Sequence, residues 1–129
     1  MRQLVTLSLL QQQSATERLR GVNYSYRVEP DDSEVLSALL RTVNQDSSVD
    51  VRLAAIDALR SFGESPIARR GLVQSLGRQN SPLTQIALVD TLTELKERSS
   101  VGTMRQLLHE KDLDENVRKR LTTAIRRLE

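Results

Sequence analysis

The pattern of hydrophobic and polar positions over residues 49–60 predicts a helix that is apolar on more than one side. One apolar stripe repeats at steps of three and four residues, as positions on one face of an α-helix do; it comprises Val51, Ala54, Ala55, Ala58, Leu59 and Phe62. Leu53 and Ile56 widen the apolar surface beyond that stripe. Because such a helix must pack against more than one neighbour, we expect it to lie in the middle of an array of helices.

The same pattern recurs further along the chain at multiples of 33 residues. Residues 84–92 keep its order of apolar, alanine, aspartate and leucine positions, and residues 117–125 form a third, more polar copy. Each copy follows another amphipathic stretch, in residues 35–43, 67–76 and 101–108. A single helix pair cannot bury both of its faces, whereas stacked pairs share a continuous core. The pattern therefore predicts an all-α solenoid.

The predicted solenoid is one domain with an N-terminal helical cap and three helix pairs. The cap and its connecting segment take residues 1–32, and the three repeats take residues 33–64, 65–97 and 98–129. The expected binding surface is the concave side, which the second helix of each pair would form.

The cap is expected to be one amphipathic helix from residue 2 to about residue 20, followed by an irregular stretch over residues 21–32. The alternative is two helices with a break at Ser14, because Ser14 and Glu17 fit a capping box. Tyr24 and Tyr26 are the only tyrosines. We expect them to anchor the irregular stretch on the first repeat, since amphipathic rings commonly bury their body and leave the hydroxyl wet; the alternative is an aromatic contact site for a ligand or partner.

Composition narrows the function mainly by exclusion. The net charge of +2 does not by itself indicate a nucleic-acid partner. The absence of cysteine excludes a disulfide framework and a thiolate metal site. No apolar run approaches the roughly 18 residues that a membrane-spanning helix needs. We therefore expect no membrane segment in this chain.

Candidate catalytic residues are sparse. His109 is the only histidine, and it lies late in a predicted helix among charged residues, which is typical of an exposed helix end. Asp31 and Asp32 precede a predicted helix, where capping and the helix dipole account for them. No glycine-rich phosphate loop and no nucleophile elbow is found. The sequence predicts a non-catalytic protein without a cofactor or a metal ion.

The turn and second helix of the first repeat resemble the HEAT repeat family. The matching positions are Asp46, Val51, Arg52, Ala54, Ala55, Ala58 and Leu59. Val117-Arg118 repeats the valine–arginine dipeptide, whereas Thr84-Gln85 replaces it in the second repeat. Over residues 33–129 the resemblance implies a right-handed HEAT-like α-solenoid. It also implies that Asp46, Arg52 and Arg118 are structural and contact neighbouring turns, with the continuity of that ladder in doubt at Gln85.

Residues 9–28, running into the first repeat, look like the C-terminal region of bacterial anti-sigma-factor-like membrane proteins with a zinc-finger segment. The resemblance implies a sensing or protein-binding module on the extracytoplasmic, periplasmic side of the inner membrane, in a membrane-anchored parent protein. The zinc-binding and membrane segments of that family have no counterpart in this sequence. Without the resemblance, a cytoplasmic location is expected.

Two other functions compete with protein binding. A nucleic-acid-binding domain is suggested by the basic last helix; its cations are Arg118, Lys119, Arg120, Arg126 and Arg127. Arg69, Arg70 and Arg78 add charge in the second repeat, but no aromatic side chain that could stack on a base accompanies the last helix. Nucleic acid is therefore the less favoured partner. Some HEAT-like proteins resemble bilin lyases or their relatives, yet no feature for handling a pigment is found here.

We predict that the chain binds a protein partner through polar side chains on the second helices, opposite the core stripe. These are Asp57, Arg60 and Glu64 in the first repeat, Asp90, Thr93 and Glu97 in the second, and Thr123 and Arg126 in the third. Because they are equivalents at 33-residue spacing, they should form rows across the surface. Their alternating charge suits a polar protein contact better than a phosphate backbone.

Overall fold

The computed structural model describes all residues from 1 to 129 and contains eight α-helices and no β-strand. The helices form four consecutive hairpins: α1 (Arg2–Leu10) with α2 (Ala15–Tyr24), α3 (Ser33–Gln45) with α4 (Val49–Arg60), α5 (Pro66–Leu76) with α6 (Pro82–Glu94), and α7 (Val101–Leu108) with α8 (Glu115–Leu128). Two short 3-10 helices, η1 (Ser25–Arg27) and η2 (Arg98–Ser100), lie between hairpins. The all-α prediction is confirmed.

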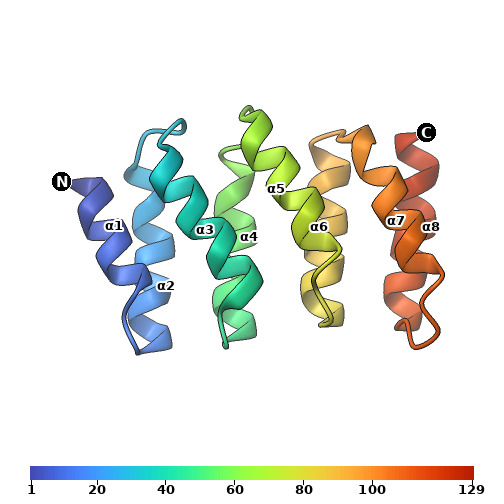
Figure 1. The fold of residues 1–129 in the computed structure, drawn as a ribbon, viewed down its shortest axis with the longest axis horizontal. Coiled ribbons are helices and arrows are strands. Elements are labelled where there is room, and N and C mark those ends of the chain that lie inside the picture. Colours follow the sequence, from blue (N-terminus) through green and yellow to red (C-terminus); the bar gives the residue numbers. More distant parts are fainter.

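The four hairpins stand side by side in a row, with the two chain termini at opposite ends (Figure 1). The first helices α1, α3, α5 and α7 form one layer, and the second helices α2, α4, α6 and α8 form the other. Each second helix contacts the next one along the row, so α4 and α6 have a second helix on either side. This is the sandwiched position that the apolar pattern of residues 49–60 predicted.

The helix starts follow the local sequence. The Ser48 hydroxyl caps α4 by accepting a hydrogen bond from the Val51 backbone N–H at 3.3 Å. Helices α5 and α6 begin at Pro66 and Pro82, where the missing N–H would have no partner within the helix. Helix α4 covers residues 49–60, the range that the hydrophobic pattern predicted.

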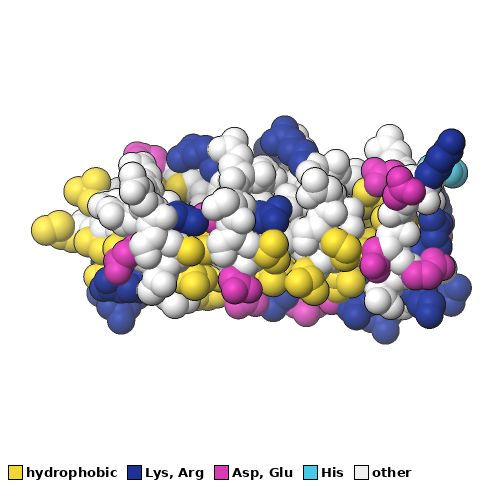
Figure 2. Space-filling model, turned by 90° about the horizontal axis from the view of Figure 1, so that it is seen from below, with side chains coloured by type: hydrophobic (Ala, Val, Ile, Leu, Met, Phe, Trp, Pro, Cys, Tyr) yellow, Lys and Arg dark blue, Asp and Glu magenta, His cyan; other side chains and the backbone are white.

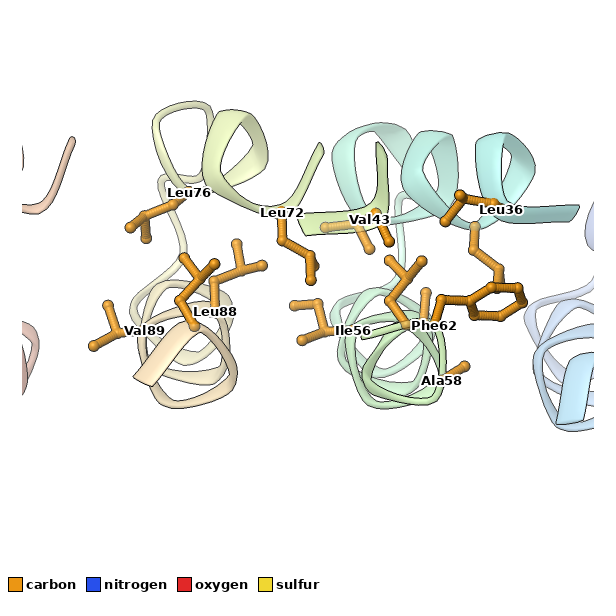
Figure 3. Packing of buried hydrophobic residues seen from close by; sticks show 14 of the residues in the cluster. Leu36, Val43, Ile56, Ala58, Phe62, Leu72, Leu76, Leu88 and Val89 are labelled. Carbon is orange, nitrogen blue, oxygen red and sulfur yellow. The ribbon is translucent and has the colours of Figure 1, made fainter. Parts of the chain in front are cut away.

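The core lies between the two layers and is one cluster of 26 buried apolar residues (Figure 3). On α4, Ile56 points toward α6, whereas Ala58 lies on the opposite side of the helix (Figure 3). Ala55 is fully buried, and Ala54 and Ala87 are half-buried against the cluster. The alanine-rich helix therefore packs on several sides, as the sequence predicted.

The N-terminal segment is a helical hairpin rather than one helix. Helix α1 ends at Leu10, and the Ser14 hydroxyl caps α2 by accepting a hydrogen bond from the Glu17 backbone N–H at 3.4 Å. The favoured prediction of one helix from residue 2 to 20 is wrong, and the capping alternative is correct. A serine that accepts from the N–H three residues later starts a new helix, because it satisfies one of the unpaired donors there.

The predicted irregular stretch over residues 21–32 is also largely wrong. Helix α2 continues through Gly21 to Tyr24, and η1 follows it directly, which leaves only residues 28–32 irregular. Gly21 allows α1 and α2 to cross closely: a Cβ atom there would lie 2.9 Å from both the Leu10 backbone nitrogen and the Leu9 Cβ. The glycine that suggested a helix end is needed for helix packing instead.

The N-terminal hairpin continues the repeat, which the sequence reasoning missed. The N-caps of the four second helices are Ser14, Ser48, Ser81 and Asp114. Four residues after these N-caps stand Arg18, Arg52, Gln85 and Arg118. The signal was present in the sequence, but the first interval is 34 residues instead of 33. That one extra residue took the first copy out of the register.

Side chains at this position link neighbouring turns. The Arg18 Nε and one terminal nitrogen donate to the Asp46 carboxylate at 2.7 and 3.0 Å, and the other terminal nitrogen donates to the Gln13 carbonyl at 2.7 Å. Arg52 donates to the side-chain oxygen of Gln79 at 3.4 Å. Asp46 and Arg52 thus make the contacts between neighbouring turns that the family resemblance implied.

This ladder of side chains ends in the third hairpin. The Gln85 amide donates to the Gln79 backbone carbonyl at 3.0 Å, within its own hairpin, and reaches no group of the following turn. Asp112, the next residue in the register of Asp46 and Gln79, is exposed. The doubt that the replacement by Gln85 raised is therefore confirmed.

Changing Gln79 to aspartate is expected to raise the free energy of unfolding by about 1 kcal/mol at neutral pH. Gln79 occupies the position of Asp46 but binds Arg52 with one neutral oxygen, and the buried Arg52 Nε has no acceptor. A carboxylate would supply one. Urea unfolding of Gln79→Asp should show the gain at pH 7 and its loss in acid, whereas Asn80→Asp, in the same turn and exposed, should change stability by less than about 0.5 kcal/mol. An equal gain in both variants would contradict the proposed pairing.

Candidate functional site

The polar residues predicted to bind a partner lie on the second-helix layer. Asp57 and Arg60 are exposed on α4, Asp90 and Thr93 are half-exposed on α6, and Thr123 and Arg126 are exposed on α8. Glu64 is exposed in the turn after α4. We call the outward sides of α4, α6 and α8 that carry the residues on those helices the second-helix face.

Cross-helix contacts tie the second-helix face together at its α4 side. The Tyr26 hydroxyl in η1 donates to the Asp57 carboxylate at 3.1 Å, and Arg60 donates to the other Asp57 oxygen at 3.0 Å. Arg60 also pairs with Glu94 of α6 at 3.0 Å. Burial raises the pKa of Tyr26, and its hydrogen bond to Asp57 raises it further. Tyr26 therefore stays neutral and acts as a donor that orients Asp57.

Tyr26 combines the two roles that the sequence left as alternatives. It is half exposed, and its hydroxyl anchors η1 on α4. It stands 34 residues before Arg60, the same interval that separates Ser14 from Ser48. The row of polar positions thus extends into the N-terminal hairpin, where the shifted register hid it.

A second cross-helix pair joins α6 to α8. Arg120 donates to Asp90 at 2.6 Å, with both side chains partly exposed. Exposed pairs of this kind contribute only about 0–1 kcal/mol to stability. Asp57 and Asp90 are thus held in place by cations of the same chain, although neither is required for the core.

A groove of about 1090 Å³ lies between α6 and α8. Its basic side chains are Lys96, Arg98, Lys119, Arg120 and Arg127, and its acidic side chains are Asp90 and Glu94. Thr93 and Thr123 of the predicted row also line it. In Figure 2, Lys and Arg side chains gather over this end of the molecule along the lower edge. The sequence reasoning noted the basic α8 but missed that the turn after α6 adds cations to it.

Glu97 is bound within the chain rather than placed on the second-helix face. Its carboxylate accepts from Arg69 at 2.6 Å and from the Ser99 hydroxyl at 2.6 Å. The Ser99 hydrogen bond, followed by that of Arg69, lowers the pKa of Glu97. These contacts therefore stabilise the fold above the ordinary glutamate pKa, and the contribution is lost as the pH falls through the lowered value.

Glu97 leaves the predicted row because the chain turns after α6. Helix α6 ends at Glu94, and Lys96 takes a left-handed backbone conformation with φ of 56°. The Glu97 backbone N–H then closes on the Leu92 carbonyl at 2.9 Å. Arg69 also donates to the Gly63 carbonyl at 3.0 Å, so it links two turns between hairpins in the way that Arg18 links two turns within hairpins.

The remaining polar groups form no centre for catalysis or metal binding. The structure contains no group of three or more histidine, aspartate or glutamate side chains that could hold a metal ion. His109 is exposed at the end of α7. None of the helices combines the length and the apolar character that crossing a bilayer requires.

Comparison with known proteins shows no relative: no protein-family model matches the chain, and no curated protein matches it. The class of protein is therefore defined by the fold and the surface alone. The chain is an all-α protein of stacked helical hairpins with one polar, cross-linked helix layer.

Proposed function

We propose that this chain is a non-catalytic protein-interaction module whose second-helix face binds a protein partner. The observation that carries the proposal is the arrangement of Asp57, Arg60, Asp90 and Arg120 on that face. They come from three adjacent helices and are held by cross-helix contacts, so the surface is organised before a partner arrives. Preorganised polar groups reduce the ordering cost of binding.

We further propose that the fold is a right-handed HEAT-like α-solenoid, with 1–32 completing the stack at its N-terminal end. Support comes from the stacked hairpins and from the contacts that Asp46 and Arg52 make between neighbouring turns. Repeat stacks of this kind commonly bind partners along the surface of one helix layer. The narrower likeness to anti-sigma-factor-like membrane proteins stays a prediction, and with it the extracytoplasmic location.

Reversing Asp57 and Asp90 together is expected to abolish partner capture without unfolding the protein. The double variant Asp57→Arg/Asp90→Arg places new cations beside Arg60 and Arg120, so the face loses its alternating charge. Affinity should fall at least tenfold, whereas urea unfolding should change by less than about 1 kcal/mol because both pairs are exposed. The measurement is capture of partners from the source cells, followed by titration with the purified partner.

The matched control is Glu29→Arg/Glu110→Arg, which makes the same change of charge at two exposed positions in turns. This control should retain capture. If the double variant at Asp57 and Asp90 binds the purified partner as tightly as the control does, the second-helix face is not the binding surface.

Nucleic acid is the alternative partner because α8 carries cations without acidic partners. Against it, Asp57, Asp90 and Glu94 interrupt the positive charge along the second-helix face, and no aromatic side chain lines the groove. A salt titration with duplex and single-stranded DNA separates the two functions. Binding that weakens steeply with salt would support the alternative, and no binding at low salt would remove it.

A further inference from the structure

The groove between α6 and α8 holds positive charge that the chain does not neutralise. Its two acidic side chains are already engaged, Asp90 with Arg120 and Glu94 with Arg60. The other cations of the groove are in no ion pair within the chain: Lys96, Arg98, Lys119 and Arg127. Four unpaired cations that share one concave surface favour an anionic occupant.

The wall of the groove is partly apolar. Ile86 of α6 and Ala124 and Leu128 of α8 contribute to it between the charged side chains. Ala124 and Leu128 are buried, and Ile86 is half-buried. An occupant that carries an apolar group beside its negative charges would use both parts of the surface.

Lys96 points to the same conclusion from the backbone. It is the only non-glycine residue with a positive φ, and it follows the end of α6 at a position where glycine is usual. A side chain in this conformation costs stability, so glycine would serve the fold better there. The chain nevertheless places a lysine at this point, where its ammonium group adds to the charge of the groove.

We propose that the groove binds a short acidic segment of a protein partner, with an apolar side chain set between its carboxylates. The carboxylates would meet Lys96, Lys119 and Arg127, and the apolar side chain would rest on Ile86. The proposal rests on the proposed function and names the chemistry of the partner. A nucleic-acid strand fits less well, because Asp90 and Glu94 border the groove and no aromatic side chain is present for base stacking.

The test uses a labelled synthetic peptide that contains Glu-Asp-Leu-Glu-Asp, titrated into the full chain by fluorescence anisotropy. The variant Lys119→Glu/Arg127→Glu should bind at least tenfold more weakly than the natural chain. The matched control Arg41→Glu/Arg70→Glu, with both positions exposed on the first-helix layer, should bind as the natural chain does. A peptide with Gln and Asn in place of Glu and Asp should not bind.

Lys96→Gly provides a second readout that a failure to fold cannot imitate. Its Tm should rise by a few degrees, because glycine adopts the left-handed conformation without strain. Its affinity for the acidic peptide should nevertheless fall severalfold. A more stable protein that binds less tightly would separate the role of the charge from that of the fold.

The proposal is overturned if the peptide binds equally to the groove variant and the control, or if single-stranded DNA binds more tightly than the peptide at matched salt. Its failure is distinct from failure of the proposed function. If the peptide does not bind but reversal of Asp57 and Asp90 still abolishes partner capture, only the acidic segment is excluded. If the peptide binds as expected but capture survives that reversal, the wider second-helix face is excluded.

Discussion

Replacing Phe62 with alanine is expected to lower the free energy of unfolding by about 3–5 kcal/mol. Phe62 is the only phenylalanine and the largest fully buried side chain, with 2% of its surface exposed. It follows the end of α4, and its ring lies beside Leu36 of α3 between the two helix layers (Figure 3). Removing the ring would leave a cavity that rigid helices on both sides cannot fill.

Urea unfolding followed by circular dichroism measures this effect. Phe62→Leu keeps most of the volume and should cost less than about 1.5 kcal/mol. Leu83→Ala, at a position that is 60% exposed, should change stability by less than about 0.5 kcal/mol. If Phe62→Ala costs no more than Leu83→Ala, the second hairpin does not pack as described.

The central helices could be predicted from the sequence because several local signals agree there. In α4 the apolar positions, the alanines and the capping Ser48 indicate the same helix, and the structure places it at residues 49–60. The recurrence of the pattern then implied stacking, because each helix pair leaves a face uncovered. Agreement between local and long-range signals is what makes such a segment predictable.

The N-terminal hairpin could not be predicted in the same way. Its helices are short and lack the alanine-rich pattern, and its register differs from the later repeats by one residue. The decisive contact, from Arg18 to Asp46, joins residues that are far apart in the sequence. Gly21 misled the analysis, because the need for close packing between α1 and α2 is not visible in a single sequence.

The candidate site was predictable in its positions but not in its pairing. Helical spacing placed Asp57 and Asp90 on the exposed side of the second helices, where the structure also has them. It could not show that Glu97 turns away to bind Arg69, because the left-handed turn at Lys96 breaks the helical spacing. For the same reason the groove was missed, since its cations come partly from that turn and partly from α8.

Replacing Asp46 with alanine is expected to lower the free energy of unfolding by about 2–4 kcal/mol. The Asp46 side chain is only 6% exposed, and it accepts two hydrogen bonds from Arg18 of the preceding hairpin. It also accepts the Ser48 backbone N–H at 2.9 Å, just before α4 begins. The substitution would leave the Arg18 guanidinium in a largely covered site without its anion, and it would loosen the turn between α3 and α4 at once.

A double-mutant cycle with Arg18→Met tests whether the two residues act as a unit. The combined variant should cost little more than Asp46→Ala alone, since either change breaks the same contact between hairpins. Asp50→Ala, which removes an exposed acid from the first turn of α4, should cost no more than about 1 kcal/mol. Simple additivity of the two substitutions at Arg18 and Asp46 would mean that the N-terminal hairpin is not coupled to the second hairpin through this pair. Non-additive values would instead show that residues 1–32 share one cooperative unit with the repeats they precede.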